Sequence, residues 1–268
     1  MHKLVALITD FGIKDHYVAV VKARILSEVS KNPSLKVEFI DITHEIPPQD
    51  VLKAGVLLSF SYKYFPEGTI FLAVIDPGVG TERKAIILKT NSHFFVGPDN
   101  GLFTLVLEKE KEVECYEILR EKVMLPPFSS TFHARDLFAP AVARVILEED
   151  LLNFCLPTKK ENLVKLKIGF AKLKKGETIE LKILCSDRFG NLITNLHEKD
   201  VEGRIEVKVN ERKIPFVKTY AEAKPGELVC LFGSEGFLEI AINQGSAEKV
   251  LKPTDKIVVT CLGEKDES

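Results

Sequence analysis

The first half of the chain alternates short apolar runs with segments of helical periodicity. Apolar residues recur three and four positions apart in three segments, which predicts helices over residues 17–29, 51–62 and 136–148. The apolar runs between them predict strands over residues 4–9, 37–42 and 69–75, and a hairpin over 85–89 and 93–96. Alternating strands and helices are typical of a mainly parallel sheet covered on both faces, an α/β sandwich of Rossmann-like type.

The pattern changes after residue 157. Residues 157–164 are polar and charged, which favours a linker. Beyond them, apolar and polar residues alternate with period two over residues 178–184, 204–209, 227–232, 237–242 and 256–261. This alternation predicts half-buried antiparallel strands, closed into a small barrel or packed as a sandwich. We therefore expect an α/β domain over residues 1–157 and a β-barrel domain over residues 165–268.

Composition narrows the class of protein further. The 268 residues are 45% apolar and 28% charged, which is typical of a globular domain. The net charge of −2 gives no general attraction to nucleic acid or to acidic membranes, so neither is an expected partner. No run reaches the roughly 20 apolar residues of a membrane span, and the first apolar run is too short for a signal peptide. We expect a cytoplasmic protein whose five widely spaced cysteines are buried, reduced thiols.

Polar residues directly follow two of the predicted buried strands. Asp10 ends the first strand and Asp15 comes soon after, at the sheet edge where open α/β sheets bind ligands. A carboxylate there can accept both hydroxyls of a ribose, and a helix-capping role fits Asp10 equally well. Asp76 begins a glycine-rich turn after another strand, and Arg83 follows seven residues later. This pair fits either a ligand site or a tight turn with a structural ion pair.

Other motifs are individually ambiguous. His133 lies just before a predicted helix, where a lone histidine is structural or catalytic. No spaced histidine pair predicts a metal site, and no Gly-x-Ser-x-Gly elbow predicts a serine hydrolase. In the second half, residues 187–191 and 233–246 carry small polar turns that fit ordinary hairpins as well as a binding site.

Six motifs, taken together and in their order along the chain, resemble those of a known family, although each motif alone is not specific. They are TDFG at residues 9–12, IDPGVG at 75–80, GPDNG at 97–101, FHARD at 132–136, SDRFGN at 186–191 and GSEGFLEIAINQGSA at 233–247. Together they make the chain resemble the S-adenosyl-L-methionine (SAM) hydroxide adenosyltransferases, the hydrolytic relatives of fluorinases and chlorinases. The resemblance covers residues 4–246, nearly the whole chain.

The resemblance implies a fold, an assembly and a reaction. It implies an α/β N-terminal domain, a C-terminal β-barrel and a homotrimer, with the active site between the N-terminal domain of one subunit and the C-terminal domain of its neighbour. The implied reaction is hydrolysis of SAM, in which water attacks ribose C5′ and gives adenosine and L-methionine. SAM is then a substrate, and no cofactor or metal is implied.

The resemblance also implies roles for particular residues. The water-activating set is Asp76, Arg83 and His133. The residues implied to bind adenosine are Asp10, Asp15, Phe189, Asn191 and Asn243. The residues implied to bind the methionine part are Asp187, which matches the group that holds its ammonium, Ser234, which lies near its carboxylate, and Glu235. Since the chain lacks tryptophan, stacking on adenine must come from phenylalanine, with Phe189 the best candidate.

Two features favour water over a halide as the nucleophile. The halogenase branch carries Tyr in place of Asp76 and Tyr-Ser in the register of residues 133–134, and a halide needs no base. Its N-terminal insertion is also absent between residues 80 and 97. Halogenases have Arg where this chain has Glu235, which would repel a methionine carboxylate unless backbone N–H groups hold it. The alternatives are a SAM-dependent halogenase and a non-catalytic protein that binds adenosine or SAM.

Overall fold

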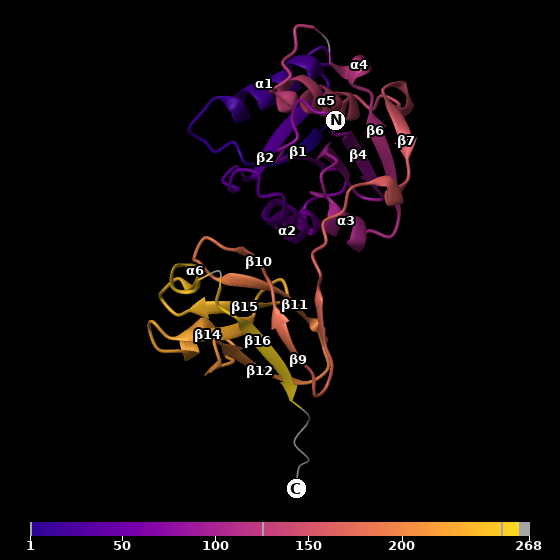
Figure 1. Cartoon of the computed structure of the whole chain (residues 1–268). Coiled ribbons are helices and arrows are strands. Elements are labelled where there is room, and N and C mark those ends of the chain that lie inside the picture. Colours follow the sequence, from indigo (N-terminus) through magenta and orange to yellow (C-terminus); the bar gives the residue numbers. More distant parts are fainter. Residues whose placement is uncertain (1, 125, 253, 263–268) are drawn as a thin grey trace. The chain divides into compact units, whose positions relative to one another are not determined.

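The computed structural model describes residues 2–124, 126–252 and 254–262 (Figure 1). The chain divides into two compact units, Met1–Leu166 and Lys167–Ser268. Each unit has its own hydrophobic core, one helical and sheet-based and the other built from strands. Each is described here by itself.

The first unit is built on one seven-stranded sheet, in the order β2-β1-β3-β5-β4-β6-β7. The strands are β1 (His2–Thr9), β2 (Lys36–Thr43), β3 (Ile70–Val74), β4 (Ala85–Thr90), β5 (Phe94–Pro98), β6 (Val113–Ile118) and β7 (Cys155–Thr158). The pairs from β2 to β5 are parallel, and the pairs from β5 to β7 are antiparallel. The sheet is thus parallel over one half only, because the predicted hairpin reverses the chain and β6 and β7 extend that edge.

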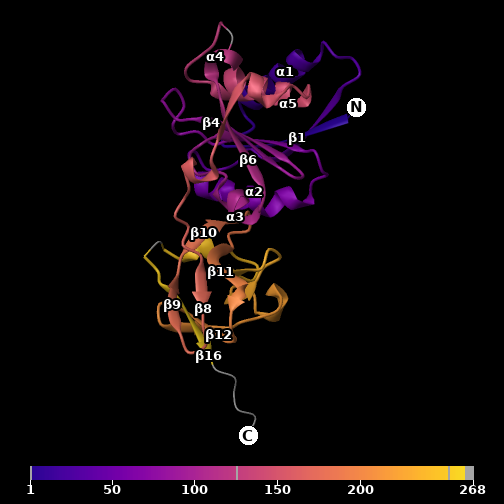
Figure 2. The ribbon, with the colours of Figure 1, turned by 90° about the vertical axis from the view of Figure 1, so that its right-hand side faces the viewer.

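Helices cover both faces of this sheet, as predicted (Figures 1 and 2). One face packs against α1 (Tyr17–Val29) and α5 (Ala139–Ile146), the other against α2 (Val51–Ser61) and α3 (Thr104–Lys109). Successive residues of β1 alternate between the two cores: Val5 and Leu7 face α1 and α5, whereas Ala6 and Ile8 face α2. The helix predicted from residue 136 begins earlier, as a π-helical turn over Ala134–Phe138.

The polar segment expected as a linker packs onto the first unit. Its first two residues belong to β7, and the side chain of Leu163 is buried in the core. Further on, the backbone N–H of Val164 donates to Asp99, and that of Leu166 donates to the Thr104 hydroxyl. These bonds keep the segment on the first unit up to its end at residue 166.

The second unit is made of two sheets, and its strand pairs are antiparallel except for β8 with β11. One sheet runs β10-β11-β15-β14, with β8 beside β11, and the other runs β13-β12-β16-β9. The strands are β8 (Ala171–Leu173), β9 (Thr178–Leu181), β10 (Ile183–Ser186), β11 (Leu192–Val201), β12 (Arg204–Val209), β13 (Arg212–Ile214), β14 (Leu228–Phe232), β15 (Phe237–Ile242) and β16 (Ile257–Leu262). The one strand predicted over residues 178–184 is therefore two strands, in different sheets. A closed barrel stays a prediction.

Candidate active site

Two loops at the carboxyl ends of neighbouring parallel strands form a cavity in the first unit. Asp10 directly follows β1 and Asp76 comes two residues after the end of β3, and the two strands pair directly. His133, which precedes the π-helical turn, completes a cavity of about 270 Å³ that all three side chains line. The fold thus brings together three predicted site residues that lie far apart in the sequence.

Asp76 and Arg83 form a buried, bidentate ion pair. Their side chains are only 6% and 7% exposed, Nε of Arg83 lies 3.0 Å from Oδ1 of Asp76, and Nη2 makes a close contact with Oδ2. The turn between them depends on Gly80, whose φ is +78° and where a Cβ would lie 2.7 Å from the carbonyl oxygen of Ser130. The predicted ion pair is confirmed, and it is held in a geometry that favours strong charge-assisted hydrogen bonds.

His133 joins this pair through its Nδ1 atom. Nη2 of Arg83 lies 3.2 Å from Nδ1, and the histidine is 4% exposed. Burial lowers the pKa of His133 below its usual 6.5, and the guanidinium groups of Arg83 and Arg120 lower it further. Because a guanidinium can only donate, Nδ1 must accept, so the neutral ring carries its proton on Nε2.

Arg83 itself lines neither of the cavities that His133 touches. It lies behind the two side chains that it binds, and its Nη1 donates to the carbonyl oxygen of Lys84 at 3.2 Å. His133 also lines a second cavity, of about 580 Å³, together with Arg120, Met124 and Phe128. Arg83 therefore holds Asp76 and His133 in position without lining the cavity itself, whereas Asp76 and His133 line the cavity.

Asp10 lines the cavity of about 270 Å³, whereas Asp15 does not. Oδ2 of Asp10 accepts the backbone N–H of Gln49 at 2.9 Å, and Gln49 adopts a left-handed φ of +67° to present it. Asp10 does not cap α1, which begins at Tyr17. Asp15 is exposed and lines none of the cavities described here.

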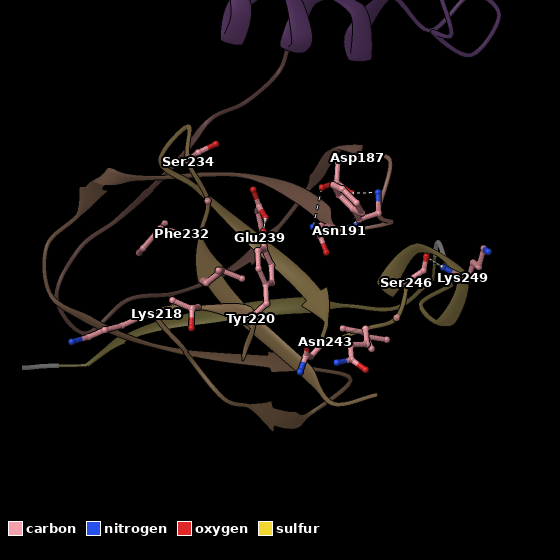
Figure 3. Close-up of a pocket in the computed structure, with 17 residues that line it drawn as sticks. Asp187, Asn191, Lys218, Tyr220, Phe232, Ser234, Glu239, Asn243, Ser246 and Lys249 are labelled. Atoms are coloured by element: carbon pink, nitrogen blue, oxygen red, sulfur yellow. Dashed lines mark hydrogen bonds between the residues drawn. The ribbon is translucent and has the colours of Figure 1, made fainter. Parts of the chain in front are cut away.

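A larger cavity, of about 1140 Å³, lies in the second unit (Figure 3). Five predicted site residues line it: Asp187, Phe189, Asn191, Ser234 and Asn243. Asp187 organises its own turn, because Oδ1 accepts the backbone N–H groups of Phe189 and Asn191, and Oδ2 accepts the Asn191 side chain, each at 2.9 Å. The Phe189 ring is 75% exposed. Glu235 does not line this cavity.

Comparison with known proteins identifies the family. The N-terminal domain model of the SAM hydroxide adenosyltransferases matches residues 5–154, and the C-terminal domain model matches residues 181–258. The chain belongs to the SAM hydroxide adenosyltransferase family. The family resemblance found in the six motifs is thereby confirmed.

Two relatives of high identity are named for the same reaction. The chain is 40% identical to "(R)-S-adenosyl-L-methionine hydrolase" of Thermus thermophilus, covering 92% of this chain and 94% of the relative. It is 36% identical to the protein of the same name from Methanocaldococcus jannaschii, covering 92% and 91%. A fluorinase of Actinoplanes is more distant, at 27% identity, covering 90% of this chain and 91% of that protein. The resemblance is thus greater to these hydrolases than to this halogenase.

Solved structures agree with this fold. A conserved protein of Thermotoga maritima, described as uncharacterized, superposes with a TM-score of 0.81 at 37% identity, covering 96% of this chain and 99% of that one. A conserved hypothetical protein of Thermus thermophilus superposes with a TM-score of 0.77 at 36% identity, covering 97% and 100%. The fold of this chain is therefore shared with these two solved proteins.

The sequence analysis did not identify three polar residues that line cavities. Arg120 lines the cavity of about 580 Å³ in the first unit, and Tyr220 and Glu239 line the cavity of the second unit. Arg120, at the start of α4 (Arg120–Val123), donates from Nη2 to the carbonyl oxygen of Thr81 at 2.8 Å and makes a closer contact with that of Arg83. In the second unit, the Tyr220 hydroxyl donates to Oε2 of Glu239 at 2.7 Å. Glu239 had one available signal: it is the only charged residue of the apolar strand β15.

No group of three or more His, Cys, Asp or Glu side chains among residues 2–124, 126–252 and 254–262 is arranged to hold a metal ion. Within those ranges, no helix has both the length and the apolar character that crossing a membrane requires.

Proposed function

We propose that this chain hydrolyses SAM by attack of water on ribose C5′, giving adenosine and L-methionine. The observation that carries the proposal is the buried set of Asp76, Arg83 and His133 beside the cavity that Asp10 also lines. The relatives named as SAM hydrolases support it. SAM is the substrate, and the reaction uses no cofactor or metal.

At C5′ the reaction breaks one bond and forms one, and a proton passes from water to a base. The C5′–S bond breaks, and its electron pair leaves with sulfur as a neutral thioether, so the leaving group needs no acid. Water supplies the new C5′–O bond and loses one proton. Since Nδ1 of His133 accepts from Arg83 and Nε2 already carries a proton, Asp76 is the base that takes it.

The other two groups hold the water and the base in position. The Nε2–H group of His133 donates to the water oxygen, which fixes the oxygen and leaves its protons directed elsewhere. Arg83 fixes both partners from behind, so Asp76 and His133 need no reorganisation during the reaction. Because Asp76, Arg83 and His133 are buried, the attacking oxygen is poorly solvated beside them, which makes it a better nucleophile.

The remaining predicted residues bind the two ends of the substrate. Asp10 accepts the ribose hydroxyls, with Asp15 near it in the sequence. Phe189 stacks on adenine, and Asn191 and Asn243 supply polar contacts to the base. The methionine part is bound at Asp187 and Ser234, with Glu235 beside them in the sequence.

The substrate is the (R) sulfonium epimer. The relatives are named for this epimer. The chain accordingly turns over the (R) epimer faster than the (S) epimer, and its role is to remove the uncommon epimer while sparing the other. Equal rates for the two purified epimers would contradict this specificity.

The assembly is a homotrimer in the cytoplasm, in which the second unit closes as a β-barrel. Each active site forms between the first unit of one subunit and the second unit of its neighbour. Sedimentation analysis tests the trimer. Mixing Asp76→Asn and Phe189→Ala subunits tests the shared site, because mixed trimers then regain some sites with both residues intact.

Incubation in ¹⁸O-labelled water tests the reaction itself. Attack at C5′ places the label in the 5′-hydroxyl of adenosine, which mass spectrometry detects. Unlabelled adenosine would contradict the mechanism. Formation of 5′-chloro-5′-deoxyadenosine in high chloride would indicate a halogenase. Bound ligand with no product would indicate a non-catalytic binding protein.

A further inference from the structure

A buried histidine, His44, lies behind the loop that carries Asp10. β1 and β2 are parallel neighbours, and His44 directly follows β2 just as Asp10 directly follows β1. His44 and Thr9 are 4% and 2% exposed, and Nδ1 of His44 lies 2.8 Å from Oγ1 of Thr9. His44 lines none of the cavities described here, so any role that it has in the site is exerted through other residues.

His44 contacts this loop on both sides of Asp10. Before Asp10, Oγ1 of Thr9 contacts Nδ1 of His44 and also accepts the backbone N–H of Phe11 at 3.3 Å. After Asp10, the carbonyl oxygen of His44 accepts the backbone N–H of Gly12 at 2.7 Å, and Gly12 adopts a left-handed φ of +66° there. The residues that flank Asp10 are therefore fixed by one histidine, through its ring and through its backbone.

The other ring nitrogen of His44 faces a carboxylate. Nε2 lies 3.1 Å from Oδ1 of Asp41, although the two atoms are not aligned for a hydrogen bond. A proton on Nε2 avoids repulsion between the carboxylate and a ring lone pair, so in the neutral ring Nδ1 accepts the hydroxyl proton of Thr9. Oδ2 of Asp41 accepts from Nζ of Lys22 on α1 at 2.6 Å. The ring is thus oriented by groups on β2 and α1, outside the loop that it contacts.

We propose that His44 is a positioning residue, which holds Asp10 where it binds the ribose hydroxyls of the substrate. This inference rests on the proposed function, in which Asp10 accepts those hydroxyls. Nδ1 of His44 acts through Thr9, and its carbonyl oxygen acts through Gly12. A binding group has to be held to within about 0.5 Å, and a turn that is fixed on both sides provides this. Loss of the ring should therefore weaken recognition of the hydroxyls and leave the rest of adenosine bound.

The test compares adenosine with 2′,3′-dideoxyadenosine, which lacks both ribose hydroxyls, by calorimetry. We expect the wild type to prefer adenosine about 100-fold, because hydrogen bonds to a charged group are lost with the hydroxyls, and Asp10→Ala to lose most of this preference. His44→Leu and Thr9→Val should each reduce the preference to about 10-fold. The double variant should reduce it no further, because both changes remove the same contact. His44→Asn, whose amide oxygen replaces Nδ1, should restore most of it.

His93→Leu is the matched control. His93 is also a buried histidine of the first unit, 6% exposed, and it lines none of the cavities described here. We expect this variant to lower the melting temperature and to leave the preference for adenosine unchanged. The control therefore separates a loss of stability from a loss of recognition.

The proposal is overturned if His44→Leu keeps the wild-type preference for adenosine, whatever its melting temperature. If that variant does not fold, Thr9→Val takes its place, and a wild-type preference in Thr9→Val overturns the proposal. A reduced preference in His93→Leu, or no preference in the wild type, also overturns it. A wild type that shows the expected preference but forms no adenosine from either SAM epimer would refute the proposed function and leave the role of His44 intact.

Discussion

The charged groups of the two cavities are arranged in opposite ways. In the first unit, Arg83 bonds to Asp76, His133 and the backbone of Lys84, so the buried charges are paired within the protein. In the second unit, Glu239 keeps one oxygen without a hydrogen bond among the described residues, and Phe189 is largely exposed. A closed network suits chemistry that requires fixed groups, whereas open acceptors suit recognition of a ligand that supplies the missing partners.

The closed network also has an energetic consequence. Removing one partner from a buried ion pair leaves the other charge uncompensated, which costs roughly 3–5 kcal/mol. Substitutions in the first cavity therefore affect both stability and activity. Substitution of Phe189 in the second unit removes a ring that is already exposed, so it acts mainly on binding.

Removing the base is the most severe way to break the closed network. We expect Asp76→Asn to lower the turnover of SAM by at least about 100-fold, because general base catalysis is lost. Adenosine release followed by chromatography measures this. Glu114→Gln, which removes an exposed partner of Lys89 in the same unit, is the control. Turnover of Asp76→Asn close to that of the wild type would exclude Asp76 as the base.

Removing the hydrogen bonds that hold the loop of Arg83 should have an intermediate effect on turnover. Arg120→Met removes the hydrogen bonds that hold the loop of Arg83, and we expect kcat to fall about 10-fold with little change in KM. Loss of this positive charge should also raise the pKa of His133 and move the acid limb of the pH–rate profile upward. Arg144→Met is the matched control, since Arg144 likewise donates to a backbone carbonyl in this unit. An unshifted profile would limit Arg120 to a structural role.

Substitution in the cavity of the second unit should change the affinity for adenosine and leave stability unchanged. Phe189→Ala removes the ring proposed to stack on adenine, an interaction of about 1–3 kcal/mol, so adenosine should bind about 10-fold more weakly. Phe189→Tyr should restore binding. The melting temperature should stay unchanged because the ring is exposed. If adenosine binds Phe189→Ala and the wild type equally, adenine does not stack there.

Acidification should produce the smallest effect, and His133 of the first unit contributes to it. The pKa of His133 in the folded protein is lowered from 6.5, so the unfolded chain binds more protons as the pH falls through 6.5. Stability is therefore complete above pH 6.5 and declines below it, by at most about 1.4 kcal/mol per pH unit for each such group. Thermal melts from pH 7.5 to 5.5 should show a shallower slope for His133→Gln. His93, whose pKa burial also lowers, contributes part of the remaining slope.

Regular segments of the fold were predictable because their patterns are unambiguous. The predicted helix over residues 17–29 matches α1, and the predicted strands over 204–209 and 237–242 match β12 and β15. β6 was missed because its charged residues interrupt both periodicities. The break between β9 and β10 was missed because the period-two pattern runs through Lys182 without a turn residue.

The candidate site was predictable where its residues share a loop or a motif. Asp76 and Arg83 are seven residues apart, so a turn suffices to pair them. His133 lies 50 residues beyond Arg83, and only the fold brings the two together. Arg120 and Tyr220 belong to no motif, and their roles depend on tertiary contacts with a carbonyl and a carboxylate that no local pattern encodes.

The five cysteines can serve as native probes of local unfolding in each unit. All five are buried and none forms a disulfide, with Cys115 and Cys155 in the first unit and the other three in the second. Burial raises the pKa of Cys155 and of Cys230 to about 12, so neither forms the reactive thiolate while the fold is intact. Alkylation by a thiol reagent therefore reports local unfolding, and peptide mapping of the label assigns each event to one unit without any engineered probe.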